Sequence, residues 1–158
     1  LFQSELSTFT LPVFEGPVGA DAADRGENLA LGASIVEVSS ELNASFSASR
    51  TLDGDLSTEW STRGDGDDGF VVIDLGSAAE IGGFAFVTRS MADGSAITHQ
   101  FTVSVDGGPA LGPFPAGTPT DPGFQAVSAS GRVLRFDVES STGGNTGAVE
   151  IQVFGPQS

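Results

Sequence analysis

Apolar residues in this chain gather in short runs, which are separated by segments rich in Gly, Asp, Ser and Pro. The run at 70–75 is nearly continuous and ends at Gly76, whereas Phe84 and Phe86 alternate with smaller or polar neighbours along 81–89. Continuous apolar runs of this length indicate buried strands, and alternation indicates strands with two different faces. The strands predicted in this way span 29–31, 35–38, 70–75, 81–89, 97–105, 124–127, 133–138 and 148–154.

No segment repeats its apolar residues with the helical period of about 3.6 residues. Turn-forming sequences such as Asp106-Gly107-Gly108 separate the predicted strands. Residues 109–122 contain five prolines, so they are expected to form a long loop, because proline cannot donate a hydrogen bond within a central strand. Short strands, frequent turns and the lack of helical periodicity predict an all-β fold, an antiparallel β-sandwich.

The chain has 158 residues, which suits a single domain. Residues 1–27 show no sustained period and are predicted to be an N-terminal extension, either draped on the sandwich or adding a strand near 9–14. The domain proper is then 28–158. The chain contains no Cys, which excludes disulfides and thiolate metal sites, so packing and any bound ion must supply its stability.

Charge is strongly unbalanced, with 21 Asp and Glu, six Arg, no Lys and a formal net charge of −15. Such a surface repels phosphate groups, which argues against binding to nucleic acids or anionic membranes. An acidic surface of this kind suits high salt, where screening weakens the repulsion between its negative charges. No apolar run is long enough to span a membrane, so membrane insertion is not expected. Since the chain begins at Leu1 rather than Met, we expect any export signal to have been removed, as in a secreted microbial protein.

The sequence Thr51-Leu-Asp-Gly-Asp-Leu-Ser-Thr-Glu-Trp60 holds the most concentrated oxygen ligands of the chain. Asp53, Asp55 and Thr58 lie within a few residues of one another, and Gly54 allows a sharp turn between the carboxylates. Calcium prefers six to eight oxygen ligands of this kind, and Glu150 is a candidate partner from the last strand. From the residues alone, a calcium loop and a plain turn remain equally open. Trp60 is expected to fill the core rather than to stack on a ligand.

Several motifs in order resemble the discoidin, or coagulation factor 5/8 type C, domain. They are Asn28-Leu-Ala-x-Gly-Ala33, Leu52-Asp-Gly-Asp55, Thr58-x-Trp60, Val72-Ile-Asp-Leu-Gly76, Ser104-Val-Asp-Gly107, Leu134-Arg135 and Glu150-Ile-x-Val-Phe154. The resemblance covers about 28–155 and is closest to the family 32 carbohydrate-binding modules. It implies an eight-stranded jelly-roll sandwich of the galactose-binding-domain type.

The same resemblance implies a structural calcium ion. Its side-chain ligands would be Asp53, Asp55, Thr58 and Glu150. Its backbone carbonyl ligands would come from the neighbourhood of Arg50 and Val149. The resemblance therefore favours calcium over a plain turn for the 51–60 segment.

Sugar-binding relatives hold their ligand in loops at one end of the sandwich. At this end the resemblance implies Arg89, with His99 on the neighbouring strand and Arg63 and Asn145 on loops. Arg89 has an alternative role as the ion-pair partner of Asp93 or another carboxylate. The chain has no Tyr and one Trp, so it is poor in the aromatic surface on which sugars usually stack.

Catalysis is not expected. The strongest carboxylate cluster is assigned to calcium, and neither a Gly-x-Ser-x-Gly elbow nor a phosphate-binding glycine loop is present. The sequence thus predicts a secreted, non-catalytic module that binds a glycan with calcium as its stabilising ion, either alone or within a larger polysaccharide-active protein. The alternative is a structural or adhesive domain that contacts proteins and uses calcium only for stability.

Overall fold

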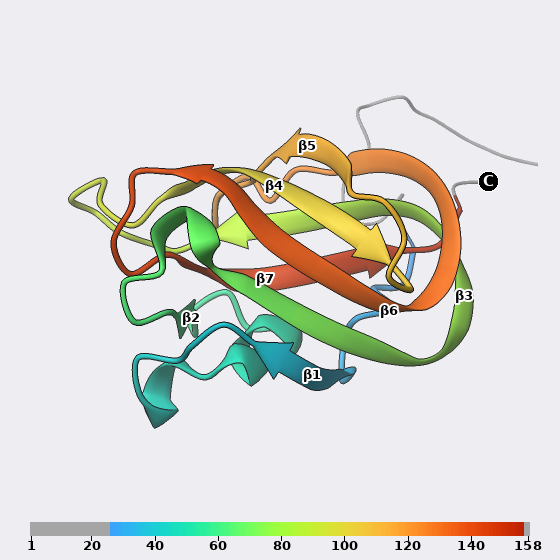
Figure 1. Cartoon of the computed structure of the whole chain (residues 1–158), viewed down its shortest axis with the longest axis horizontal. Coiled ribbons are helices and arrows are strands. Elements are labelled where there is room, and N and C mark those ends of the chain that lie inside the picture. The colour runs from blue at the N-terminus through green and yellow to red at the C-terminus, as the bar shows by residue number, and fades with distance from the viewer. Residues whose placement is uncertain (1–25, 157–158) are drawn as a thin grey trace, which may run out of the picture.

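The computed structural model describes residues 26–156, which form seven β-strands and three short 3-10 helices (Figure 1). The strands are β1 (Ser34–Val38), β2 (Trp60–Ser61), β3 (Phe70–Thr88), β4 (Thr98–Val105), β5 (Leu111–Pro115), β6 (Gln125–Ser141) and β7 (Gly147–Phe154). The helices are η1 (Ala44–Phe46), η2 (Ala48–Leu52) and η3 (Gly66–Asp68). All pairs between named strands are antiparallel, which confirms the predicted fold class.

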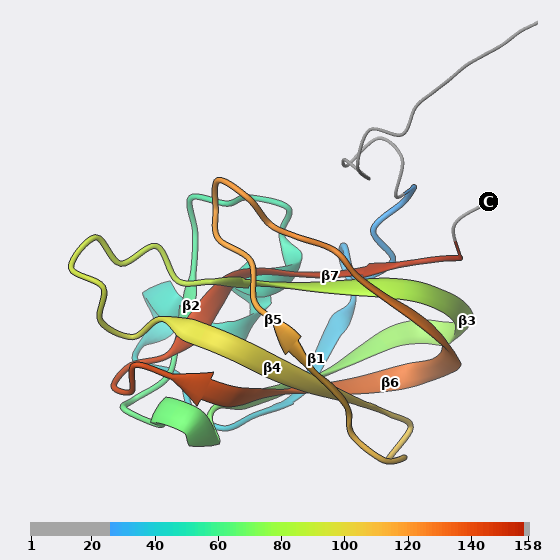
Figure 2. The same cartoon turned by 90° about the horizontal axis from the view of Figure 1, so that it is seen from above.

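The two longest strands, β3 and β6, bend together and take part in both layers of the sandwich. Residues 70–74 of β3 pair with 133–137 of β6, and beyond an irregularity the pairing continues from 79 to 84. Figure 2 shows both strands turning back at the same end of the molecule. One layer contains β1, β4 and β5, and the other contains β2 and β7. The hydrogen-bonded order of all the strands is β2-β7-β3-β6-β4-β5, with β1 beside β3.

These bends are one reason why the strands differ from the eight predicted, because each bend joins two predicted strands into one. The sequence indicated separate strands at 70–75 and 81–89, whereas the structure joins them into β3. The hydrophobic pattern is interrupted there, but Ala79 and Glu80 still pair with Gly131 and Ser130 across the bend. Backbone hydrogen bonding does not depend on side-chain polarity, so the ladder continues where the apolar pattern stops.

Two further predictions need correction. Residues 29–31, predicted as a strand, form a turn in which Leu31 is 57% exposed. The proline-rich segment, predicted as a loop, contains β5, which pairs only with β4. Proline is tolerated in β5 because an edge strand has one side free of ladder hydrogen bonds.

The core lies between the two layers and is built largely from aromatic and branched side chains. Phe84 contacts Phe136 with ring centroids 5.7 Å apart, and Phe86 stacks on Phe101 at 5.3 Å. Trp60 is fully buried, as predicted for a core residue, and its indole N–H donates to a backbone carbonyl. These contacts join the later part of β3 to β4 and β6 across the core.

Most of the predicted extension, residues 1–25, lies outside the described residues. Within 26–156, no helix is long and apolar enough to cross a membrane.

Candidate functional site

The loop between η2 and β2 contains most of the predicted calcium ligands. Asp53 follows η2 directly, and Gly54 has a φ of 74°, a conformation that suits glycine. The two carboxylate oxygens of Asp53 accept hydrogen bonds from the Asp55 N–H at 3.0 Å and the Thr58 hydroxyl at 2.6 Å. Asp53 therefore organises the loop and brings three of the predicted ligands together.

Glu150 meets this loop from β7. Ile151 and Val153 on the same strand point into the core. Because successive side chains of a strand point to opposite faces, Glu150 points to the other face, where the 53–58 loop covers it. Glu150 is 1% exposed, and its Oε2 accepts a hydrogen bond from the Gly54 N–H at 3.1 Å. Its Oε1 is buried and has no hydrogen-bond partner among the described residues. A buried carboxylate oxygen without a partner is costly, and either a bound proton or a bound cation would reduce that cost.

Burial also changes the acidity of Glu150. Loss of water raises the pKa of this carboxyl to about 8, and the negative charges of Asp53 and Asp55 add to the rise. The Gly54 hydrogen bond opposes it. In the metal-free protein at neutral pH, the side chain is therefore mostly protonated.

Asp55 is oriented differently from the other predicted ligands. Its Oδ1 accepts hydrogen bonds from the Ser57 N–H at 2.8 Å and from the Ser57 hydroxyl at 2.6 Å. These bonds, with a smaller contribution from Arg50, lower the pKa of Asp55. The backbone carbonyl of Asp55 accepts from the Thr58 hydroxyl at 3.1 Å. Asp55 thus shapes the turn both through its side chain and through its backbone.

The oxygen donors of this loop are of the kind that calcium binds. Within residues 26–156, no group of three His, Cys, Asp or Glu side chains is placed to hold a metal, so the carboxylates alone do not form a complete site. Calcium also accepts hydroxyl and backbone carbonyl oxygens, which two carboxylates and the Thr58 hydroxyl would supplement. The predicted carbonyl donors lie near Arg50 and Val149. Arg50 belongs to η2, which precedes the loop, and Val149 belongs to β7, which contacts the loop through Glu150.

Arg89, the first predicted sugar contact, lies just after the end of β3 and is 7% exposed. Its Nε donates to the Glu59 carboxylate at 2.9 Å, so its ion-pair partner is Glu59, a carboxylate other than Asp93, as the alternative role allowed. Its Nη1 donates to the Ser61 hydroxyl at 3.2 Å and to the Asn145 carbonyl at 2.8 Å. The Glu59 carboxylate also accepts from the Ser90 N–H at 3.2 Å.

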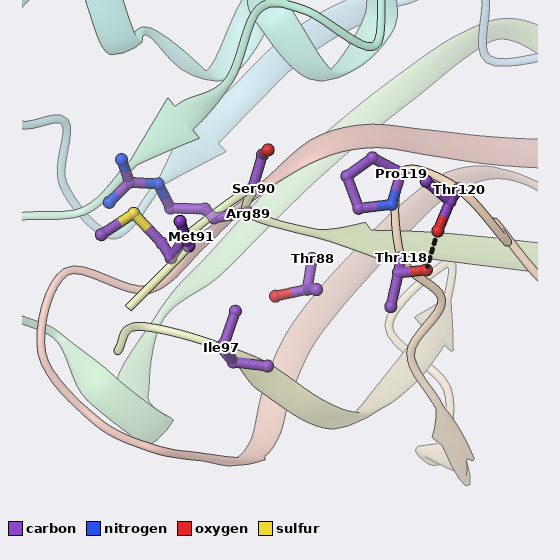
Figure 3. Close-up of a pocket in the computed structure, with 9 residues that line it drawn as sticks. Thr88, Arg89, Ser90, Met91, Ile97, Thr118, Pro119 and Thr120 are labelled. Carbon is purple, nitrogen blue, oxygen red and sulfur yellow. Dashed lines mark hydrogen bonds between the residues drawn. The ribbon is translucent and has the colours of Figure 1, made fainter. Parts of the chain in front are cut away.

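Arg89 lines an open pocket of about 320 Å³ at the loop end of the sandwich. The pocket is formed by residues 88–92, Ile97 and 118–120. Figure 3 shows the guanidinium group beside Met91 at one end of the pocket and Pro119 with Thr120 at the other. The walls combine apolar side chains with Ser and Thr hydroxyls and include no aromatic ring. A pocket of this size and character is sufficient for a small polar ligand with apolar faces.

The other three predicted sugar contacts do not line this pocket. Asn145 lies next to Arg89 through its backbone carbonyl. His99 is exposed on β4 and accepts a backbone hydrogen bond from Ala116 through its carbonyl. Arg63 is exposed, and its backbone N–H donates to the Ser40 hydroxyl. Their roles in ligand binding stay predictions.

Sequence reasoning missed Glu59 and the 118–120 segment. Glu59 stands between Thr58, a predicted calcium ligand, and Trp60, a predicted core residue, and nothing in the local sequence indicates that it pairs with Arg89. Thr118 and Asp121 form reciprocal backbone hydrogen bonds around Pro119 and Thr120. The Gly117 N–H donates to the Phe86 carbonyl, and this bond brings the segment against β3. A pairing between such distant segments leaves no local pattern in the sequence.

These features define the chain as a β-sandwich domain with a loop-end pocket and an oxygen-rich loop against its last strand. A family model described as the F5/8 type C domain matches residues 35–151. The chain therefore belongs to the F5/8 type C domain family. Among curated proteins, none matches it significantly.

Solved structures share the fold. Chitosan-binding module 1 of a chitosanase/glucanase from Paenibacillus sp. IK-5 is 24% identical, with a TM-score of 0.58 over 82% of this chain and 99% of that one. The family 32 carbohydrate-binding module of NanJ from C. perfringens, in complex with galactose, is 16% identical, with a TM-score of 0.62 over 77% and 93%. A putative alpha-L-fucosidase from Bacteroides thetaiotaomicron is 15% identical, with a TM-score of 0.60 over 85% of this chain and 30% of that one.

Proposed function

We propose that this domain is a non-catalytic carbohydrate-binding module, stabilised by calcium, of a secreted microbial protein. The observation that carries the proposal is the loop-end pocket of about 320 Å³, with Arg89 held rigidly in its lining. Guanidinium N–H groups and hydroxyls are suited to the oxygen atoms of a sugar, and apolar walls are suited to its C–H faces.

The family and the structural neighbours support this choice. The similar structures include modules described as binding chitosan and one in complex with galactose, each of which this domain covers almost completely. In the fucosidase, a domain like this one is a small part of a longer chain. We infer that this domain likewise acts beside a polysaccharide-active partner, which supplies the catalysis that the domain itself lacks.

Calcium belongs to the proposal because of the unpartnered oxygen of Glu150. Asp53, Thr58 and Glu150 would supply side-chain oxygens. Asp55 would supply either its carboxylate or its backbone carbonyl. The remaining ligands would be the backbone carbonyls of Arg50 and Val149. The ion would neutralise buried negative charge and connect the 53–58 loop to the last strand. It has no catalytic part in this scheme.

A glycan array, followed by calorimetry on the best ligand, tests the function. We expect binding to at least one glycan, and we expect Arg89→Ala to weaken it by about tenfold or more, because a buried donor group is lost. The matched control is Arg132→Ala, which removes an exposed arginine that is paired with Asp74 far from the pocket. Lack of binding to any glycan, together with self-association or capture of a protein, would favour an adhesive domain instead.

A further inference from the structure

The charge of Arg89 is already balanced inside the protein. Among the lining residues of the pocket, all within the described part of the chain, Arg89 is the only charged one. Its Nε lies 2.9 Å from Glu59 Oε1, and the two side chains are 8% and 19% exposed. Because both groups are largely withdrawn from water, solvent and salt screen their attraction only weakly.

The orientation of the guanidinium group is set by several contacts at once. Nε is directed to Glu59, and Nη1 is shared between the Ser61 hydroxyl and the Asn145 carbonyl. The ring of Phe46 lies 5.4 Å from the guanidinium carbon. Nη2 makes no hydrogen bond within residues 26–156, so its N–H groups remain available to a ligand oxygen. Arg89 thus offers directed hydrogen bonds without an unbalanced positive charge.

The surroundings add no positive charge that could replace it. The other lining residues are apolar or carry hydroxyl groups, and the whole chain has a formal net charge of −15. A ligand carboxylate would therefore enter a negative field and would find its cation already paired. Leaving a carboxylate without a partner in a partly buried site costs affinity. A neutral hydroxyl or amide oxygen carries no such cost.

We propose that the pocket discriminates against acidic saccharides and that Glu59 is the specificity-determining residue, because its carboxylate cancels the charge of Arg89. This inference rests on the proposed carbohydrate-binding function. Glu59 acts through Arg89 and is a positioning residue: it aims the guanidinium group and removes its preference for anions. In a chain without Glu59, the same arginine would favour acidic sugars.

Matched ligands test this specificity. Galactose and galacturonic acid share one ring and differ in charge, and a glycan array extends the comparison to neutral glycans and their uronic-acid or sialylated counterparts. We expect the wild-type protein to bind neutral members about tenfold or more tightly than their carboxylate counterparts. Glu59→Gln keeps an acceptor for Nε and removes the charge. It should shift the ratio of affinities toward the carboxylate members by about tenfold.

The matched control is Glu80→Gln, which removes the same charge from an exposed position near the middle of β3, at its bend and outside the lining of the pocket. It should leave the ratio unchanged, and thermal unfolding of each variant establishes that it is folded. Failure to bind any glycan would overturn the proposed function itself. Binding of carboxylate sugars as tightly as neutral ones would overturn only the discrimination against acidic sugars, and an unchanged ratio in Glu59→Gln would overturn the role of Glu59.

Discussion

Glu150 is a charged residue type in a position that water does not reach. It is 1% exposed on β7, and one of its carboxylate oxygens has no partner among the described residues. Burying such a group without compensation usually costs a few kcal/mol of folding free energy. The protein can meet this cost by holding a proton, as its raised pKa indicates, or by holding a cation.

In the absence of calcium, Glu150 should make the protein less stable as the pH rises. Its pKa is about 8 in the folded state and near 4.5 when exposed, so between these values the native state binds a proton that the unfolded state has lost. The free energy of unfolding should therefore fall from about pH 5 to pH 8 and level off above that. Urea unfolding in a chelator, compared between wild type and Glu150→Gln, measures this difference, and parallel curves for the two proteins would contradict it.

With calcium present, the same residue should become a source of stability. At a free calcium concentration about 100 times its dissociation constant, the ion should add about 2.7 kcal/mol to the free energy of unfolding. Asp53→Ala and Glu150→Ala should each remove the response of the melting temperature to calcium and to a chelator. Glu139→Ala, an exposed acidic residue on β6, serves as the control and should keep the response. An unchanged response in the Asp53 and Glu150 variants would rule out this cage.

At the scale of elements, the site depends on how closely β2 approaches β7. Ser61 pairs with Gly147, and a Cβ atom added to Gly147 would lie 2.0 Å from the Trp60 carbonyl oxygen. The same short strand carries the Ser61 hydroxyl that receives a hydrogen bond from Arg89. β2 therefore connects the 53–58 loop that precedes it, where we propose a calcium ion, to Arg89 in the wall of the pocket.

Gly147→Ala should separate these two strands. The clash is with backbone rather than with a flexible side chain, so we expect a loss of about 2–4 kcal/mol in stability and weaker glycan binding. Gly155→Ala is the control, because its added Cβ would come no closer than 3.9 Å to a neighbouring atom. Denaturant unfolding measures both variants, and equal stability of the two would show that β2 can move at little cost.

At the scale of the whole molecule, the net charge of −15 influences both stability and ligand choice. Like charges spread over a small domain repel one another and destabilise the compact state. Of the five arginines within residues 26–156, three are paired with carboxylates: Arg89 with Glu59, Arg132 with Asp74 and Arg135 with Asp137. The acidic surface therefore repels anionic ligands, and in the proposed function the pocket selects among the remaining ones.

Sodium chloride should stabilise this domain. Raising the salt concentration from about 0.01 M to 1 M shortens the screening length from roughly 30 Å to 3 Å, which weakens self-repulsion. The melting temperature, measured in a chelator to exclude calcium, should rise over this range. Combined Glu80→Gln and Glu139→Gln variants, which remove exposed charges, should show a shallower rise. A melting temperature that falls with salt would indicate that attractive pairs dominate.

Much of the fold was accessible from the sequence, because its causes are local. Alternating and continuous apolar runs predicted β3, β4 and β7 near their observed positions. The bends were not predicted, since the residues that continue the β3–β6 ladder through them are small or polar. β5 was also missed, because its prolines argue against a strand unless its edge position is known.

The sequence by itself determined the β-sandwich class, the family motifs and the oxygen-rich 51–60 segment, because strand periodicity and turn chemistry are written in neighbouring residues. Only the tertiary structure decided that Glu150 is buried with an unpartnered oxygen and that Arg89 pairs with Glu59. Both results depend on side chains from segments far apart in the sequence, and nothing in a residue's own neighbours reports how much water a distant loop removes from it. Desolvation and charge pairing, which set the chemistry of both sites, are therefore properties of the folded chain.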